Sequence, residues 1–330
     1  MKAALLSALL LAAPLSAQPA LDEAELFRRI ESHVDSLAKA DRFSGVVLLA
    51  RNGKPVFERA WGFADREAKR PNTVETAFNI GSINKLFTTI AIRQLEAAGK
   101  LHLDSTLARA WPDYPNPDVA RRVTIRQMLG HRAGISGNIF AAPAGKSRHD
   151  VRHNNDFLPL IVNEPLAFEP GARQQYSNAG FVLLGMLVER LSGKDYYEYV
   201  RENVYAPAGM ARTAAYPVDA LPPNTAIGYT GTPGARERNT ASLPGRGSAA
   251  GGGYSTPHDL VRFLQALRGG KIANGPPAGS VGIAGGAPGL NAIMEGDLPG
   301  GYDLVVMANM DPPAANQVGR AIRGWLGSPD

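Results

Sequence analysis

The chain has 330 residues, of which 44% are hydrophobic, 35 are basic, 30 are acidic and none is cysteine, and its formal net charge is +5. This length and composition indicate a globular protein with a substantial core, and the lack of cysteine excludes disulfides, a thiol nucleophile and a cysteine-based zinc site. The basic residues are scattered and form no stripe with interleaved aromatic residues, so we expect no nucleic-acid partner.

The first predicted element is a secretory signal at residues 1–20. A charged start precedes an apolar run at residues 3–13 and small residues at 14–17. The apolar run is too short to span a bilayer, and no later segment approaches the roughly 20 residues needed. We therefore expect a secreted or periplasmic mature chain without a membrane anchor.

An amphipathic helix and a β-hairpin follow the signal. Apolar residues recur at helical spacing in residues 26–37. Strand-like runs at residues 45–51 and 54–62 flank Asn52 and Gly53, a pair typical of a two-residue hairpin turn. The chain is therefore predicted to begin with antiparallel sheet.

A lysine then occupies an unfavourable position at the start of a helix. Ser82 follows Gly81 and precedes an apolar helical pattern that ends at Gly99, which predicts Ser82 as the N-cap. Lys85 would lie in the first turn, where the helix dipole disfavours a cation and lowers its proton affinity. A spacing of three residues puts both side chains on one face, so Lys85 could serve as the base for the Ser82 hydroxyl.

The pattern Ser-x-x-Lys also arises by chance about once in a chain of this length. A second copy, at residues 36–39, lies inside the charged amphipathic helix and is interpreted as solvated helix surface. Simple capping by Ser82 remains the alternative to catalysis.

Helical patterns dominate residues 86–210, and the clearest of them are residues 123–129, 181–191 and 195–204. Two segments rich in Gly, Pro, Asn and Ala, residues 138–157 and 216–253, are too long for passive connections. They are either walls of a cleft or mobile surface loops.

The last part of the chain returns to strand patterns. They lie at residues 289–295 and 302–308, between helical patterns at 257–267 and 314–326. Strands thus come from both ends of the chain, around a helical block.

This order of elements predicts an α+β fold in which an antiparallel β-sheet is flanked by helices. Residues 21–85 and 250–330 would form a discontinuous sheet domain. Residues 86–249 would form a mostly helical insertion whose loops line the cleft.

A serine nucleophile needs a proton relay, and Tyr176-Ser177-Asn178 offers a phenol and an amide. The triplet follows a turn at residues 168–171 and precedes an apolar helix. A tyrosine held beside a lysine could share its proton. The alternative is a core tyrosine, and the same spacing recurs at residues 114–116 in a proline-rich loop.

The six histidines show no typical metal-ligand spacing, and His149 and His153 are the nearest approach to one. We expect no metal and no cofactor.

Taken together, five motifs resemble those of the superfamily of class C β-lactamases and penicillin-binding proteins, whose members include serine esterases and D-amino-acid peptidases. They occur in the family's order, at residues 78–85, 101–104, 128–134, 168–171 and 176–178. The resemblance covers about residues 26–326. It implies a sheet flanked by helices, a helical domain inserted after the first strands, and an active site in the groove between them.

The resemblance also implies roles for individual residues. Ser82 would be the nucleophile, Lys85 and Tyr176 the proton carriers, and Asn178 a polar group facing the substrate. It implies a structural role for His131.

One further family motif, a basic residue on a strand beside the nucleophile, is altered, because Ile283 stands in its place. The backbone amides of Ser82 and Gly286 could still form an oxyanion hole, and Gly285 and Ala287 would adjoin the substrate.

Isoleucine, however, can neither bind a substrate carboxylate nor help to ionise a tyrosine. This favours neutral esters or amides over carboxylate-bearing β-lactams and peptides, unless a loop supplies charge from Arg148, Arg173 or Lys146.

We therefore predict a serine hydrolase that forms an acyl-enzyme on a small ester, amide, peptide or β-lactam, with neutral esters favoured. A neutral Lys85 and an ionised Tyr176 are kinetically equivalent as the base.

The alternatives to this function are a β-lactamase, a D-alanyl-D-alanine carboxypeptidase or a D-aminopeptidase. A catalytically weak binding protein is a further alternative, suggested by Ile283 and a short connection at residues 270–281. No Gly-x-Ser-x-Gly sequence occurs, which argues against an α/β-hydrolase. The sequence does not predict the oligomeric state.

Overall fold

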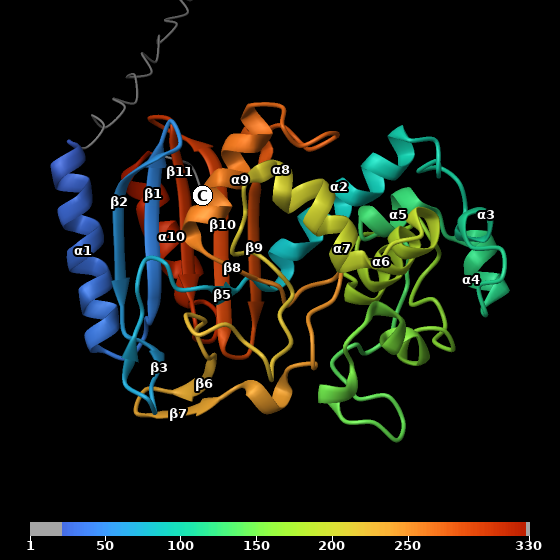
Figure 1. Cartoon of the computed structure of the whole chain (residues 1–330), viewed down its shortest axis with the longest axis horizontal. Helices are drawn as coiled ribbons and strands as arrows, with labels where there is room; N and C mark the ends of the chain where they lie inside the picture. The colour runs from blue at the N-terminus through green and yellow to red at the C-terminus, as the bar shows by residue number, and fades with distance from the viewer. Residues whose placement is uncertain (1–21, 328–330) are drawn as a thin grey trace, which may run out of the picture.

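The computed structural model describes residues 22–327 and consists of a sheet half and a mostly helical half (Figure 1). The predicted signal at residues 1–20 lies outside the described residues and stays a prediction. Within residues 22–327 no helix is both long and apolar enough to cross a membrane.

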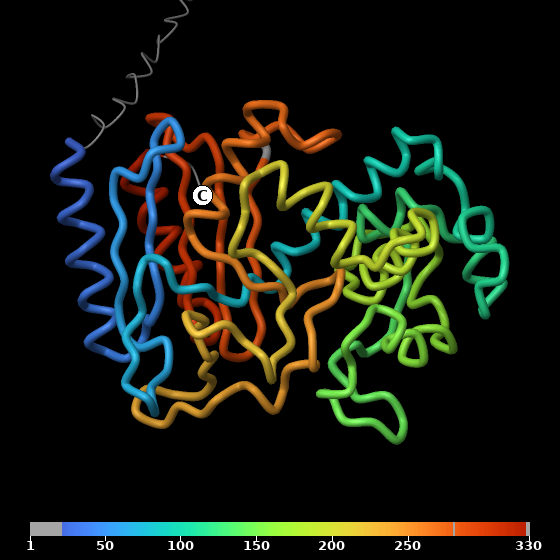
Figure 2. Tube along the Cα trace, in the orientation of Figure 1, coloured from blue at the N-terminus to red at the C-terminus, as the bar shows by residue number. Residues whose placement is uncertain are grey.

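The sheet half is built on five antiparallel strands in the order β2-β1-β11-β10-β9. These strands are β1 (Gly45–Arg51), β2 (Lys54–Trp61), β9 (Gly282–Ala287), β10 (Leu290–Leu298) and β11 (Tyr302–Ala308). Asn52 and Gly53 both have positive φ, as the predicted two-residue turn between β1 and β2 requires. Strands from the two ends of the chain pair with each other, since Gly45 of β1 lies opposite Ala308 of β11 (Figure 2). The predicted α+β class with an antiparallel sheet is confirmed.

Each face of the sheet is covered by its own helices. Alternate residues of β1 point to opposite faces, so Val47 and Leu49 pack against α1 (Glu23–Lys39) and α10 (Ala314–Trp325). Val46 and Leu48 belong to the larger core cluster, which also contains residues of α2 (Asn84–Ala97) and α9 (Pro257–Arg268). The sheet is therefore the wall between two apolar cores.

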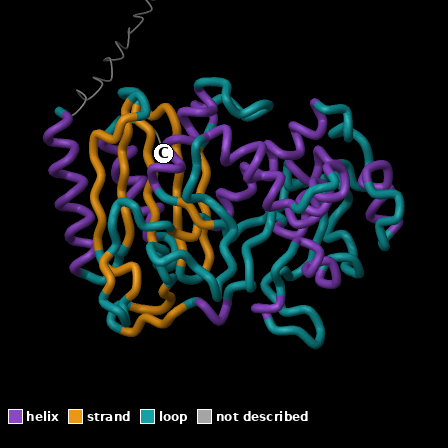
Figure 3. Tube along the Cα trace, viewed as in Figure 1, coloured by secondary structure: helices purple, strands orange, loops and turns teal. Residues whose placement is uncertain are grey.

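The helical half contains mostly short helices (Figure 3). They are α3 (Leu107–Ala110), α4 (Pro117–Arg122), α5 (Ile125–Leu129), α6 (Asn178–Ser192), α7 (Tyr196–Val200), a π-helical turn (Arg201–Tyr205) and α8 (Ala206–Ala208). Helix α5 begins later than predicted because Thr124 is its N-cap, in a reciprocal capping box with Gln127.

Three pairs of short strands complete the fold. They are β3 (Phe63–Asp65) with β4 (Arg70–Pro71), β5 (Phe78–Asn79) with β8 (Tyr254–Ser255), and β6 (Tyr229–Thr232) with β7 (Ala235–Arg238). Residues 229–238 fall inside the predicted helical insertion, but they form a hairpin beside the sheet half (Figure 1). Tyr229 bridges to Met310, and Arg236 pairs with Asp41 and Asp311. The proposed domain boundaries otherwise stay a prediction.

Candidate active site

Ser82 lies in a short 3-10 turn, η1 (Gly81–Ile83), between β5 and α2. The prediction that Ser82 caps the helix is wrong, because the N-cap of α2 is Ile83 and no side chain caps it. Gly81 adopts a φ of 50°, and its amide is held by the side chain of Asn79 at 3.0 Å. The hydroxyl of Ser82 is thus free of a capping role.

The Ser82 hydroxyl instead contacts two predicted proton carriers. Its Oγ accepts a hydrogen bond from Tyr176 Oη at 2.6 Å and one from Lys85 Nζ at 3.1 Å. Lys85 Nζ also donates to Asn178 Oδ1 at 2.8 Å and to the carbonyl of Ala250. The structure therefore brings together the serine, lysine, tyrosine and asparagine that the sequence singled out.

The pKa values of the two proton carriers shift in opposite directions. The Lys85 side chain is only 5% exposed, and this burial lowers its pKa to about 7. Burial is the cause that the structure reveals, in addition to the helix dipole considered from the sequence. Burial raises the pKa of Tyr176, and the hydrogen bond to Ser82 offsets only part of that rise. Near neutral pH the lysine is consequently much easier to deprotonate than the tyrosine.

His131 contacts the ring of Tyr176 and binds the backbone of its two neighbours. The two rings lie 4.6 Å apart and are tilted by 31°. The amide of Ser177 donates to His131 Nδ1 at 3.1 Å, and the amide of Gln175 donates to the His131 carbonyl at 2.8 Å. Burial, with a smaller contribution from Lys85, lowers the pKa of His131. Its contacts hold both neighbours of Tyr176 in place, as expected for a structural role.

Asn178 is the first residue of α6, and Ser177 is its N-cap, with Oγ accepting from the Gly180 amide at 3.0 Å. Asn178 lines the cleft, and its role as a group that faces the substrate stays a prediction. Its Oδ1, however, is already engaged by Lys85.

The edge strand β9 lies against η1. A Cβ atom added to Gly285 would lie 2.0 Å from the Ile80 carbonyl and 2.8 Å from the Ser82 amide nitrogen. A Cβ on Gly81 would lie 3.0 Å from the Gly286 amide nitrogen. Only glycine permits this approach, which brings the two predicted oxyanion-hole segments together.

The register of the hairpin orients the Gly286 amide. Ala287 and Leu290 close the two-residue turn, so the next pair, Gly286 and Asn291, is of the type without hydrogen bonds between its members. The Gly286 N–H therefore points away from β10, towards η1.

Not every residue predicted on β9 adjoins the cleft. Gly286 and Ala287 line it, whereas Gly285 is buried against η1 and does not. Ile283 packs against the larger core, so its position contributes no charge to the cleft.

Residues 248–250 form a segment that contacts Lys85 through the Ala250 carbonyl. The sequence did not reveal this contact. Three buried side chains bind the backbone of this segment: Asn84 donates to the Ser248 carbonyl, Asn154 accepts from the Ala249 amide, and Thr88 donates to the Ala249 carbonyl. The available signal was the run of three glycines that follows, in which Gly252 has a φ of 95°.

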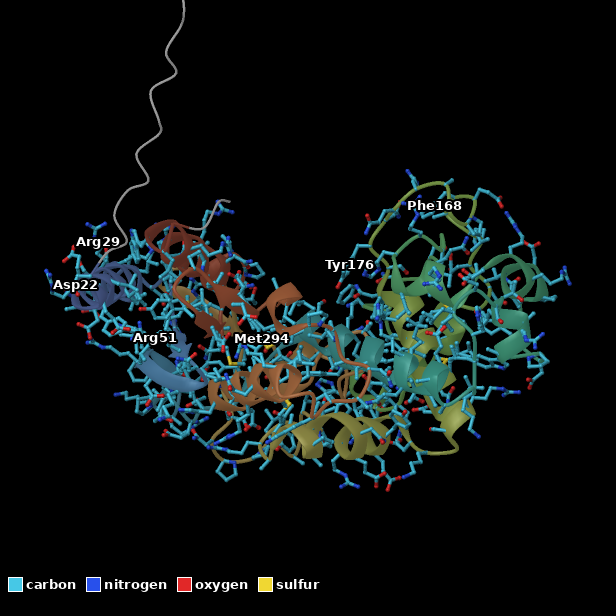
Figure 4. All side chains as sticks on the ribbon, turned by 90° about the horizontal axis from the view of Figure 1, so that it is seen from above. Asp22, Arg29, Arg51, Phe168, Tyr176 and Met294 are labelled. Atoms are coloured by element: carbon cyan, nitrogen blue, oxygen red, sulfur yellow. The ribbon has the colours of Figure 1, made fainter. Side chains whose placement is uncertain are left out.

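Ser82, Tyr176 and Asn178 line a cleft of about 680 Å³. Residues of both long segments, 138–157 and 216–253, line its walls. The apolar lining includes Ile139, Phe140, Phe157, Val218, Leu243 and Pro244. Seen from above, Tyr176 lies on the side of the helical half that faces the sheet half (Figure 4).

Of the three cations considered as sources of charge, Arg148 lines the cleft and the other two do not. Lys146 pairs with Asp156 at 3.6 Å, and Arg173 lies over the ring of Phe168.

His149 and His153 do not come together as a metal site. His149 contacts the Thr240 carbonyl, and His153 lies 3.7 Å from Asp195. Across residues 22–327 there is no group of three or more metal-ligating side chains.

The chain matches a known protein family and is similar to several known proteins. The model of the family described as Beta-lactamase matches residues 28–323. Penicillin-binding protein 4* of Bacillus subtilis (strain 168) is 31% identical over 191 residues, which are 57% of this chain and 42% of that protein. Esterase EstB of Burkholderia gladioli is 31% identical over 284 residues, which cover 75% of this chain and 71% of that protein. The chain thus spans less than half of the length of the first relative and about two thirds of the second.

A solved structure is similar over most of its length. The crystal structure of a penicillin binding protein from Bacillus halodurans has a TM-score of 0.78 and 32% identity. The match covers 88% of this chain and 98% of the other.

Proposed function

Since this chain belongs to the Beta-lactamase family, we propose that it is a serine hydrolase that hydrolyses carboxylic esters through an acyl-enzyme formed on Ser82. The observation that carries the proposal is the placement of the Ser82 hydroxyl within hydrogen-bond distance of both Lys85 and Tyr176, at the base of an apolar cleft. A nucleophile and a base in such contact are what acyl transfer requires.

Lys85 is the base in this proposal. With a pKa of about 7, it is substantially neutral at physiological pH. A neutral amine has two N–H donors and one lone pair. Asn178 Oδ1 and the Ala250 carbonyl accept the two N–H bonds, which leaves the lone pair for the proton of Ser82. The raised pKa of Tyr176 argues against an ionised phenol in that role.

Acylation then proceeds in balanced steps. Ser82 Oγ forms a bond to the substrate carbonyl carbon while its proton moves to Lys85 Nζ. The backbone amides of Ser82 and Gly286 stabilise the oxyanion, and each such donor contributes about 3 kcal/mol in well-studied enzymes. The bond to the alcohol breaks, and the alcohol takes the Lys85 proton through the Tyr176 hydroxyl. Water repeats the sequence on the serine ester and releases the acid.

The proposed substrate preference follows from the wall beside the nucleophile. Ile283 puts no cation on β9, so a carboxylate held next to that strand would be left unpaired. The name of one relative, an esterase, agrees with this preference, and the names of others, penicillin-binding proteins, favour the alternative of a β-lactam or peptide substrate.

Three reagents separate these possibilities: a p-nitrophenyl ester, a chromogenic cephalosporin and a fluorophosphonate probe. We expect ester turnover and fluorophosphonate labelling in the wild type, with both lost in Ser82→Ala. Faster cephalosporin turnover than ester turnover would replace the esterase proposal with a β-lactamase. Inertness towards all three would support a binding protein.

A further inference from the structure

Arg148 is the one charged side chain that lines the cleft within the described part of the chain. It begins a short 3-10 turn, η2 (Arg148–Asp150), in the long segment 138–157 that follows α5. Its carbonyl accepts from the Gly245 amide at 3.0 Å, so the two loops that form the wall are joined at this residue.

Only some of the N–H groups of the Arg148 guanidinium form hydrogen bonds within the protein. Nη1 donates to the carbonyls of Ile139 and Ala141 at 2.8 and 3.1 Å. Nε is buried without a hydrogen-bond partner, and no described carboxylate lies within 4.0 Å of the side chain. Burial alone lowers its pKa, with no contribution from a neighbouring charge.

Some other partly buried arginines pair with carboxylates, whereas Arg70 and Arg246 bind backbone carbonyls and do not line the cleft. Arg236 pairs with Asp41 and Asp311, and Arg268 pairs with Asp297 and Asp303. A buried cation without a counter-charge costs free energy, because water no longer solvates it fully. At Arg148 no described carboxylate supplies the counter-charge, and a ligand in the cleft that this residue lines can supply it.

We propose that Arg148 binds a carboxylate carried by the acyl part of the ester substrate, so that the preferred substrates are half-esters of dicarboxylic acids. The planar guanidinium suits a carboxylate, and the neighbouring Ile139, Phe140 and Phe157 suit a methylene chain between that carboxylate and the ester. The acyl part is assigned because it stays in the cleft through both half-reactions, whereas the alcohol leaves after the first. This inference rests on the proposed esterase function and names its substrate class.

The absence of a cation at Ile283 favours substrates without a carboxylate beside β9. A carboxylate at the far end of the acyl chain is a separate case. A carboxylate beside β9 finds no cation, whereas a carboxylate at the loop wall finds Arg148.

The test compares p-nitrophenyl half-esters of dicarboxylic acids, from adipic to azelaic acid, with p-nitrophenyl esters of monocarboxylic acids of equal carbon number. Spontaneous hydrolysis is subtracted for each ester. For the chain length that fits, we expect kcat/KM of the half-ester to exceed that of its neutral counterpart about ten- to a hundredfold, mainly through KM. In Arg148→Gln this ratio should fall to about one, and in Arg148→Lys it should be intermediate.

Lys146→Gln is the matched control, because it removes one positive charge from the same loop at a residue that does not line the cleft. For Lys146→Gln the ratio of kcat/KM between the half-ester and its neutral counterpart should equal that of the wild type. An equal fall of this ratio in both variants would mean a general effect of charge and overturn the assignment to Arg148. Should Arg148→Gln fail to fold, the wild-type ratios still decide, since ratios near one at every chain length overturn the inference. In that outcome turnover of the neutral esters leaves the proposed function intact, whereas inertness towards all esters refutes both.

Discussion

At the scale of single residues, the proposed reactivity of Ser82 depends on the burial of Lys85 beside it. Lys85 is enclosed by Asn178 on one side and by the carbonyl of Ala250 on the other. The sequence motifs singled out Ser82, Lys85 and Tyr176, because each motif, Ser-x-x-Lys and Tyr-x-Asn, is local in the sequence. They could not identify Ala250, whose contribution is a backbone carbonyl that any residue possesses. For the same reason they did not reveal the burial that lowers the pKa of the lysine.

Removal of the Tyr176 hydroxyl should impair chemistry without unfolding the protein. Tyr176→Phe loses the hydrogen bond to Ser82 but keeps the ring contact with His131. We expect kcat to fall about 10²- to 10⁴-fold, as for the loss of a proton carrier, with little change in the melting temperature.

The control is Tyr114→Phe, which removes the hydroxyl of the other tyrosine in a Tyr-x-Asn triplet. Tyr114 is buried against Trp111, and it does not line the cleft. Its variant should retain wild-type kcat. A Tyr176→Phe enzyme of undiminished kcat would exclude the phenol from proton transfer.

At the scale of elements, the contact between β9 and η1 brings together the two amides of the proposed oxyanion hole, those of Ser82 and Gly286. The sequence predicted a strand from residue 289, but Pro288 and Gly289 form the turn, and β10 begins at Leu290. Strand β9 itself has three small residues at its centre and lacks the alternation of apolar and polar residues that marks a strand. The resemblance to a family located this segment, and its own pattern did not.

Two glycines of β9 offer a matched pair of substitutions. In Gly285→Ala the new methyl group would collide with the Ile80 carbonyl and push β9 away from η1. A displacement of about 1 Å at a catalytic site can cost about 10²-fold in rate, so we expect kcat to fall by that order. Gly282→Ala places the same group in open space on the same strand.

Steady-state kinetics on both variants, with circular dichroism to confirm folding, measures this contrast. Gly282→Ala should stay within about twofold of the wild type, in line with the small effects of substitutions at open surface sites. Equal kinetics for the two variants would mean that the spacing of β9 and η1 has no part in catalysis.

At the scale of the whole molecule, the sheet separates a core that supports the cleft from a core that does not. The amphipathic patterns of α1 and α10 predicted both helices well, because each buries a single apolar stripe. The position of the β6–β7 hairpin was missed, because it is fixed by contacts of Tyr229 and Arg236 with residues far away in the sequence.

Stability and catalysis should therefore be separable. Ile30 of α1 is fully buried in the core on the side of the sheet away from α2. Ile30→Ala should lower the free energy of unfolding by about 2–5 kcal/mol and leave kcat/KM nearly unchanged at temperatures where the variant is folded. Denaturant unfolding and ester hydrolysis measure the two quantities, with the exposed Ser36→Ala as the control. A proportional loss of kcat/KM would show that the two cores are coupled.

The most direct test of the central claim is the rate of fluorophosphonate labelling as a function of pH, with the adduct located by peptide mass spectrometry. The lysine acts as a base only when it is neutral, and burial lowers its pKa to about 7. The labelling rate should therefore rise with pH, pass through an inflection near pH 7 and then level off, with the adduct on Ser82. An adduct on another residue, or a rate that inflects only near the ordinary pKa values of lysine and tyrosine, about 10, would contradict the account.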